Sequence, residues 1–102
     1  MINIYQGETA YLEVTVLNED GQAADLNGAT AKFICAKGTE TLKKDCTIVG
    51  NVVKVKLLPE DTDNMSGNYK FEIKLKDVAN DVDTILYSSF TVQKSLLPQY
   101  DA

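Results

Sequence analysis

The sequence predicts an all-β fold, an immunoglobulin-like antiparallel β-sandwich of about seven strands. Three observations support it: apolar and polar residues alternate along most of the chain, glycine-containing turns interrupt the alternation at short intervals, and no segment shows a helical period. About seven short strands in about 100 residues match such a sandwich, in which each of two sheets buries one face. At 102 residues the chain has the size of one domain.

The alternation defines the expected strands. It is clearest where Tyr69, Phe71 and Ile73 point inward between residues that point to solvent. Pro59, followed by acidic residues, predicts one helical turn over 59–64. The expected strands are residues 2–5, 10–17, 29–36, 45–49, 52–58, 68–76 and 84–92. In the last of them, the inward residues are expected to be Leu86, Ser88, Phe90 and Val92.

One core is expected between the two sheets, and Phe33, Phe71 and Phe90 are its aromatic members. Tyr69 begins the sixth strand after a glycine, which is typical of a tyrosine corner. We therefore expect Tyr69 to be buried, with its hydroxyl bonded to the loop 61–65. The predicted core comprises Leu12, Val14, Val16, Phe33, Val53, Val55, Leu57, Phe71, Ile73 and Phe90.

Composition narrows the possible partners. Apolar residues at 44% and charged residues at 25% are ordinary for a folded globular domain. A net charge of −5 repels a phosphate backbone, and the lysines alternate with apolar residues along the strands, so nucleic acid is not an expected partner. No apolar run has the length of a membrane span, and the first residues lack the features of a secretory signal. No membrane partner is expected, and the protein is expected to stay in the compartment where it is made.

The residue types disfavour catalysis. The chain has no histidine, which removes the commonest general base and the commonest nitrogen ligand of metals. The acidic stretches 61–64 and 77–83 either bind calcium through oxygen atoms or are solvated turns; the absence of an EF-hand pattern favours turns. No enzyme activity, cofactor or metal site is expected. Cys35 and Cys46 are expected to be free buried thiols, with a disulfide between strands as the alternative.

Contact with other proteins is expected at sheet edges and at the C-terminal segment. The short strands 2–5 and 45–49 are candidate edges, whose unpaired backbone groups can accept a strand from a partner. Residues 1–93 form the expected sandwich, and residues 94–102, which lack periodicity, are a tail or linker. The candidate contact residues are the isoleucines of the edge strand 2–5, the exposed tyrosines, and the leucines of the C-terminal segment, which have no place in the core: Ile2, Ile4, Tyr11, Tyr87, Leu96, Leu97 and Tyr100.

Several turn motifs recur in the same order as in a known family. They are Gln6-Gly7-Glu8-Thr9, Asp25-Leu26-Asn27-Gly28-Ala29, Leu58-Pro59-Glu60-Asp61-Thr62 and Gly67-Asn68-Tyr69. Together with the strands between them, they cover nearly the whole chain, which resembles the N-terminal domain of phage baseplate upper proteins. The sequence has no fibre-like segment after this region, which leaves open both a piece of a longer protein and a separate accessory domain.

The resemblance implies a non-enzymatic structural role in the tail baseplate of a phage or prophage virion, with synthesis in the bacterial host cytoplasm. Its implied partners are other virion or baseplate proteins, and copies of the domain itself in the assembly. The alternative, from a different class, is a domain of a capsid decoration or tail fibre protein that binds carbohydrate or the host surface.

Overall fold

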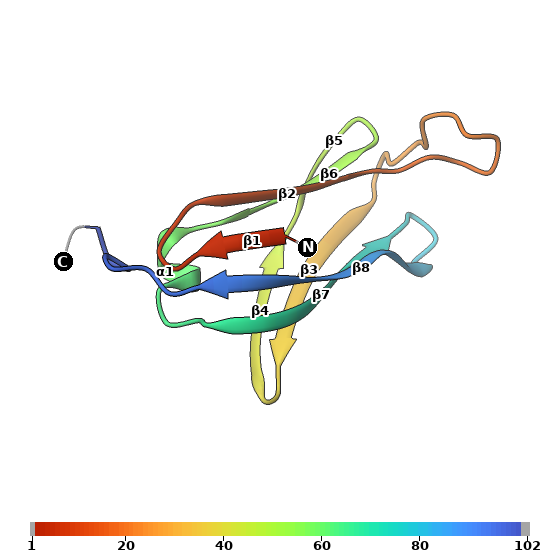
Figure 1. Ribbon diagram of the computed structural model, residues 1–102. Coiled ribbons are helices and arrows are strands. Elements are labelled where there is room, and N and C mark those ends of the chain that lie inside the picture. The colour runs from red at the N-terminus through yellow and green to blue at the C-terminus, as the bar shows by residue number, and fades with distance from the viewer. Residues whose placement is uncertain (1, 101–102) are drawn as a thin grey trace.

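The computed structural model describes residues 2–100, and it confirms the all-β fold. Within these residues, eight strands form two sheets that pack as a sandwich, and one helical turn lies at one end of it (Figure 1). The larger sheet has the strand order β1-β8-β7-β3-β4, and the smaller sheet has the order β2-β6-β5. The strands are β1 (Ile2–Tyr5), β2 (Ala10–Thr15), β3 (Thr30–Lys37), β4 (Glu40–Asp45), β5 (Thr47–Val49), β6 (Val52–Leu57), β7 (Gly67–Lys76) and β8 (Val82–Gln93), and the helical turn is α1 (Pro59–Thr62).

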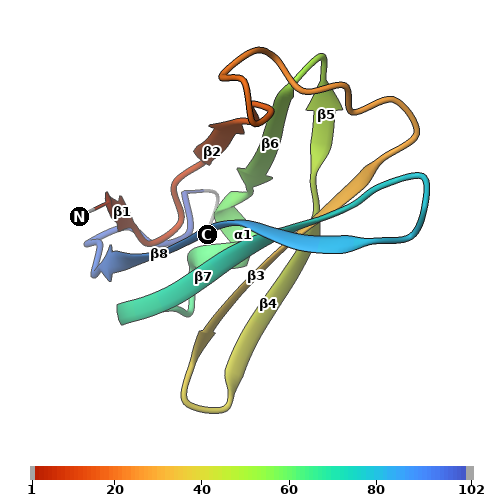
Figure 2. The same ribbon diagram turned by 90° about the vertical axis from the view of Figure 1, so that its right-hand side faces the viewer.

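Neighbouring strands pair antiparallel, with one exception. β1 runs parallel to β8, which places Ile4 opposite Val92. The chain crosses from the larger sheet to the smaller one between β4 and β5, with Cys46 as the connecting residue, and Figure 2 shows the two sheets as separate layers. The segment 40–49 therefore contributes one edge strand to each sheet.

Strand β4 was not predicted, and the expected strand 45–49 is divided between the two sheets. The residues of β4 hide its character, because Leu42 is its one apolar member and Lys44 lies opposite the buried Phe33. Lys44 is accommodated there because its Nζ lies 2.7 Å from Oδ2 of Asp61, and both side chains are largely shielded from solvent. A strand with an inward lysine does not show the alternation of a half-buried strand.

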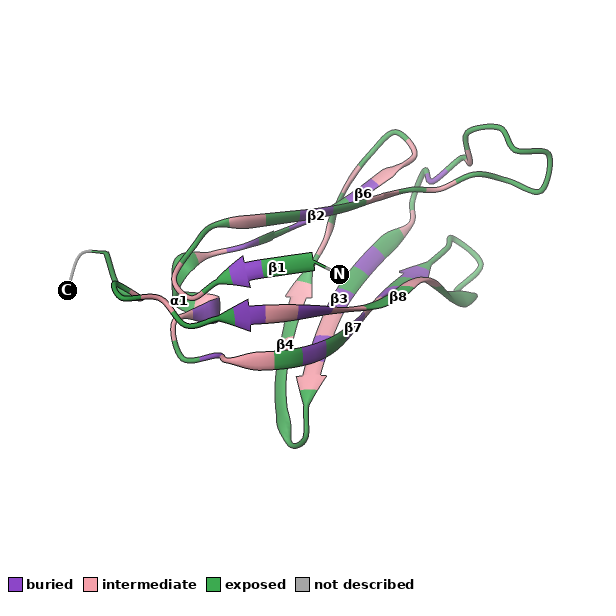
Figure 3. Cartoon of the chain, in the orientation of Figure 1, coloured by how far each residue is buried: buried purple, intermediate pink, exposed green. Residues whose placement is uncertain are grey.

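The core lies between the two sheets (Figure 3). All ten residues predicted for it belong to it, eight of them buried, with Val14 and Val16 half-buried against the others. Four aromatic rings form its centre, because Phe71 lies 5.6 Å from both Phe33 and Phe90, and Tyr69 lies 5.7 Å from Phe90, measured between ring centroids. These separations suit the tilted and offset arrangements that aromatic rings prefer.

The last strand departs from a regular alternation. Its register against β7 shifts between Ile73 and Lys74, so that Ile85 has no partner in the ladder. Such a β-bulge reorients the chain, and Ile85 and Leu86 are both half-buried as a result. Ser88 lies opposite the buried Phe71, but its side chain is exposed, which corrects the prediction that it points inward.

Cys35 and Cys46 are free thiols; Cys35 is buried as expected, whereas Cys46 is half-buried because it lies in the connection between the two sheets. Burial raises the pKa of each to about 11. No helix in the described part of the chain is both long and apolar enough to cross a membrane.

Candidate docking surfaces

The sheet edges are the first candidate surfaces. β1 and β4 border the larger sheet, and β2 and β5 border the smaller one. Strand 2–5 is therefore an edge as expected, and so is the part of 45–49 that forms β5. β1 and β5 are short, and β4 carries the inward Lys44, which are devices that proteins use to prevent uncontrolled strand addition.

The predicted contact residues do not form one surface. Tyr11 lies on the outside of the smaller sheet beneath Lys56, whose Nζ is 5.7 Å from the ring centroid, whereas Tyr87 lies on the outside of the larger sheet. Ile2 is exposed at the edge strand β1. The prediction that Ile4 is a contact residue is wrong, because its side chain is only 4% exposed. The parallel pairing of β1 with β8 directs this side chain into the core. Its side chain is not available to a partner.

One end of the sandwich gathers α1, the turn at Gln6 and Gly7, and residues 94–100; we call it the helical-turn end (Figure 1). The Gln6 amide joins three segments there. Its Nε2 donates to the Met65 carbonyl at 2.6 Å, and its Oε1 accepts from the Ser95 backbone N–H at 3.2 Å. The Gly7 N–H donates to Oγ1 of the fully buried Thr62 at 3.0 Å. Three of the four recurrent motifs therefore lie at or beside one site.

The C-terminal segment lies against this turn. Gly7 has φ +74°, and a Cβ atom at this position would lie 1.8 Å from the Pro98 carbonyl oxygen, so a larger residue does not fit without movement. Gln99 donates from Nε2 to Oδ2 of Asp63 at 3.1 Å. Leu96, Leu97 and Tyr100 are exposed, and Leu96 is 106% exposed. The segment is thus held mainly through polar atoms while its apolar side chains remain free for contact; residues 101 and 102 lie outside the described residues.

The opposite end, which we call the loop end, consists of residues 16–29 and the β7–β8 hairpin, residues 77–83 (Figure 1). A Cβ at Gly28 would lie 2.4 Å from Cγ1 of Val78, so the two segments touch. Oδ1 of Asp77 accepts from the N–H groups of Ala79 and Asp81, which makes it a turn residue. The described residues contain no group of three or more His, Cys, Asp or Glu that could hold a metal ion.

Tyr69 is buried as predicted, but the partner of its hydroxyl is different. The hydroxyl donates to Oε2 of Glu40 at 2.5 Å, and not to the loop 61–65. Glu40 reaches it because the unpredicted hairpin of β3 and β4 places Glu40 at the start of β4. Burial and, second to it, the hydrogen bond to Glu40 together raise the pKa of Tyr69 to about 12. Tyr69 therefore joins the core to the β3–β4 hairpin.

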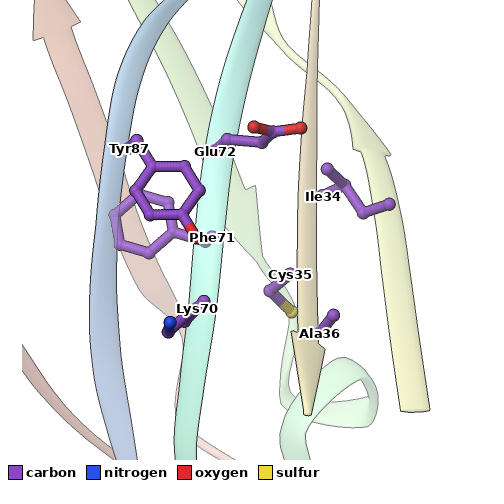
Figure 4. Close-up of a pocket in the computed structure, with 7 residues that line it drawn as sticks. All are labelled: Ile34, Cys35, Ala36, Lys70, Phe71, Glu72 and Tyr87. Atoms are coloured by element: carbon purple, nitrogen blue, oxygen red, sulfur yellow. The ribbon is translucent and has the colours of Figure 1, made fainter. Parts of the chain in front are cut away.

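The outer face of the larger sheet is a surface that the sequence analysis did not identify. Figure 4 shows Tyr87 on β8, Lys70 and Glu72 on β7, and Ile34 and Ala36 on β3. The register aligns Tyr87, Glu72 and Ile34 across three strands. Ile34 and Ala36 are apolar residues on the solvent side of β3, between Lys32 and Lys37, and this break in the alternation is the signal that could have revealed the surface.

The fold and these surfaces define a β-sandwich domain that offers edges, a held tail and an outer sheet face to partners. The family model described as the BppU N-terminal domain, where BppU denotes baseplate upper protein, matches residues 1–101. The chain therefore belongs to the family of N-terminal domains of baseplate upper proteins, which are structural domains of phage baseplates.

The comparison with solved structures supports the fold alone. A crystal structure described as "a putative glycoside hydrolase from Bacteroides vulgatus" aligns with a TM-score of 0.62 at 10% sequence identity. The alignment covers 93% of this chain and 17% of that protein, so it concerns a small part of the larger chain. No curated protein matches this sequence.

Proposed function

We propose that this domain is a non-enzymatic assembly module of a phage or prophage virion, which attaches to other proteins of the tail baseplate. The observation that carries the proposal is the family match over residues 1–101. The virion tail is the proposed location, and the bacterial host cytoplasm is the proposed place of synthesis. Neither nucleic acid nor a membrane is a proposed partner, because the chain carries a net charge of −5 and alternates its lysines with apolar residues along the strands.

The proposed docking element is the C-terminal segment, residues 94–102, following the sandwich of residues 1–93. Gln6, Gly7 and Asp63 hold this segment, and its exposed leucines and Tyr100 offer apolar contact area. Holding a contact segment in one conformation lowers the entropy that binding must overcome. Many weak contacts in a symmetric assembly then combine into tight attachment, so the isolated domain need not bind strongly.

The test compares incorporation into virions with folding. One variant lacks residues 95–102, and a second carries Gly7→Ala, which collides with the Pro98 carbonyl and displaces the segment without shortening the chain. Gly38→Ala is the matched control, because Gly38 has φ +60° but a Cβ there meets no atom within 4 Å. We expect each glycine variant to lose about 1–2 kcal/mol of unfolding free energy, because alanine is strained at a positive φ. Only Gly7→Ala and the deletion are expected to reduce incorporation.

Electron microscopy of purified virions, with an antibody against the domain, measures the incorporation, and thermal unfolding measures the fold. Absence of the wild-type domain from purified virions would contradict the proposed function. Normal incorporation of the deletion variant would leave the baseplate role standing and would exclude the C-terminal segment as its docking element.

A further inference from the structure

The outer face of the larger sheet is basic, although the protein as a whole is acidic. β3 and β4 contribute one lysine each and β7 contributes three, and the register brings them onto one face: Lys32, Lys43, Lys70, Lys74 and Lys76. Two carboxylates, Glu72 and Asp45, share that face, so its net charge is +3 (five minus two) in a chain of net charge −5. We call this surface the lysine face.

Apolar residues lie in the middle of the lysine face, on either side of Glu72. Tyr87 is 63% exposed, and it lies in the same row as the half-buried Ile34, with Ala36 in the next row (Figure 4). Lys43 is paired with Ile34 on one side of these residues, and Lys70 is paired with Ala36 on the other. Neither lysine makes an ion pair or side-chain hydrogen bond within residues 2–100. An exposed aromatic centre with a charged rim is the usual arrangement of a protein interface.

The complementary surface is on the same molecule, at the loop end. Residues 16–29 and 77–83 contain six carboxylates and no lysine: Glu19, Asp20, Asp25, Asp77, Asp81 and Asp83. Apolar side chains are exposed beside them, since Leu17, Val78 and Val82 are each more than half exposed. The loop end therefore offers what the lysine face lacks, namely negative charge around projecting apolar residues.

We propose that the lysine face of one copy binds the loop end of a second copy of this chain. The two surfaces have opposite charge, and each has exposed apolar residues among its charges, so the contact combines electrostatic attraction with apolar burial. The two patches are different, so each copy uses its lysine face for one neighbour and its loop end for the other. Such a heterologous contact repeats from copy to copy and produces a ring where the rotation closes.

This inference deepens the proposed function, because it names copies of the domain as partners within the assembly, and its setting rests on that function. The contact itself does not involve the C-terminal segment. Self-association of the purified domain and incorporation into virions can therefore fail independently, and each failure identifies the proposal that it contradicts.

A charge swap tests the contact. One variant carries Lys43→Glu and Lys70→Glu, which make the lysine face acidic. The other carries Glu19→Lys, Asp20→Lys, Asp81→Lys and Asp83→Lys, which make the loop end basic and keep the turn residues Asp25 and Asp77. Each variant alone then has two surfaces of the same sign and should associate much more weakly than the wild type. In a mixture, the native loop end of the first binds the native face of the second, and the two reversed surfaces also match. Association should therefore return only when the two variants are mixed.

Analytical ultracentrifugation measures the association, and NMR peak shifts locate the contact. Protein concentrations up to about 1 mM allow detection of binding free energies as weak as about 4 kcal/mol. We expect the wild type to associate, with shifts at Ile34, Lys70 and Tyr87 and at residues 77–83. Each charge-reversed variant should bind at least about tenfold more weakly, and so should the wild type when salt rises from about 0.05 M to about 0.5 M.

The matched control is Lys54→Glu with Lys56→Glu, an equal change of charge on the outer face of the smaller sheet, which should leave association unchanged. A wild type that stays monomeric at low salt would overturn the proposal. Equal weakening by the control variant, binding of DNA by the lysine face, or failure of the mixture to restore association would overturn it as well.

Discussion

The two ends of the sandwich are stabilised in different ways. At the helical-turn end, side chains bond to segments far away in the sequence: Gln6 to Met65, Gly7 to Thr62, and Ser95 to Gln6. At the loop end, Asn18, Asp25 and Asp77 accept hydrogen bonds from backbone N–H groups two to four residues further on. Asn51, which bonds the Val16 carbonyl at the base of the loop, is an exception.

This difference separates what the fold requires from what it permits. Each loop-end turn satisfies its own backbone groups, so its exposed turn residues can change with little effect on the rest of the molecule. Val16 and Leu26 in the same segment belong to the core and are fixed by packing. The helical-turn end depends on Gln6, Gly7 and Thr62 together, because each residue satisfies or fits a group on another segment. The recurrent Gln-Gly motif therefore has a physical explanation, which is the joining of the first strand, the helical turn and the C-terminal segment.

The largest expected effect lies in the core that both ends share. Phe71→Ala removes a ring that contacts Phe33 and Phe90, and it should lower the free energy of unfolding by about 3–5 kcal/mol. Chemical denaturation of the variant and the wild type measures this loss. Hydrogen exchange should show the loss at both ends equally, because a small domain unfolds as one unit. If only one end loses protection, the two ends are separate folding units, and their comparison must be revised.

A matched pair of substitutions tests the two ends directly. Thr62→Val keeps the shape of a fully buried residue but leaves the Gly7 N–H without its acceptor, and we expect a loss of about 1–3 kcal/mol. Asn18→Ala removes an acceptor of two hydrogen bonds, but the freed N–H groups are exposed and can bond to water, so we expect less than about 1 kcal/mol. Urea denaturation measures the free energy of unfolding of both variants. An equal or larger loss for Asn18→Ala would contradict the conclusion that the two ends are stabilised in different ways.

Local patterns in the sequence predicted most of the fold. The alternation in residues 52–58 and 68–76 identified β6 and β7, and Pro59 marked the helical turn, because burial of one face and fixed φ angles act over a few residues. β4 could not be recognised, because Lys44 points inward and is tolerated only through Asp61, 17 residues away. The position of Ile85 outside the ladder likewise depends on pairing with another strand.

The candidate surfaces were less predictable, because they depend on which strands become neighbours. Tyr87 was recognised as an exposed aromatic residue, but its place in one row with Glu72 and Ile34 follows from the order β8-β7-β3. The same order gathers lysines that are separated along the chain. Ile4 was misassigned for the same reason, since its direction is set by its parallel pairing with β8.

The smallest effect concerns Tyr69, whose partner Glu40 also lies far away in the sequence. Tyr69→Phe removes the hydroxyl bond, and we expect a loss of about 0.5–1.5 kcal/mol at neutral pH, near the lower value because Glu40 is exposed and can bond to water. Urea denaturation measures this loss. A gain in stability would show that the hydroxyl is poorly accommodated in the folded protein.

The pH dependence of this loss identifies its origin. Burial, and then Glu40, raises the pKa of Tyr69 from 10.0 in the unfolded chain to about 12 in the folded protein. The folded protein thus keeps a proton that the unfolded chain releases, so the contribution is present below pH 10.0 and disappears as the pH rises through about 12. The raised pKa values of Cys35 and Cys46 also lower the free energy of unfolding as the pH rises from 9.0 to about 11. Both thiols are present in the wild type and in Tyr69→Phe, so this change does not account for a difference between the two. The difference between wild type and Tyr69→Phe in urea should therefore narrow above pH 10.0, and a constant difference would mean that the hydroxyl is not shielded as the structure has it.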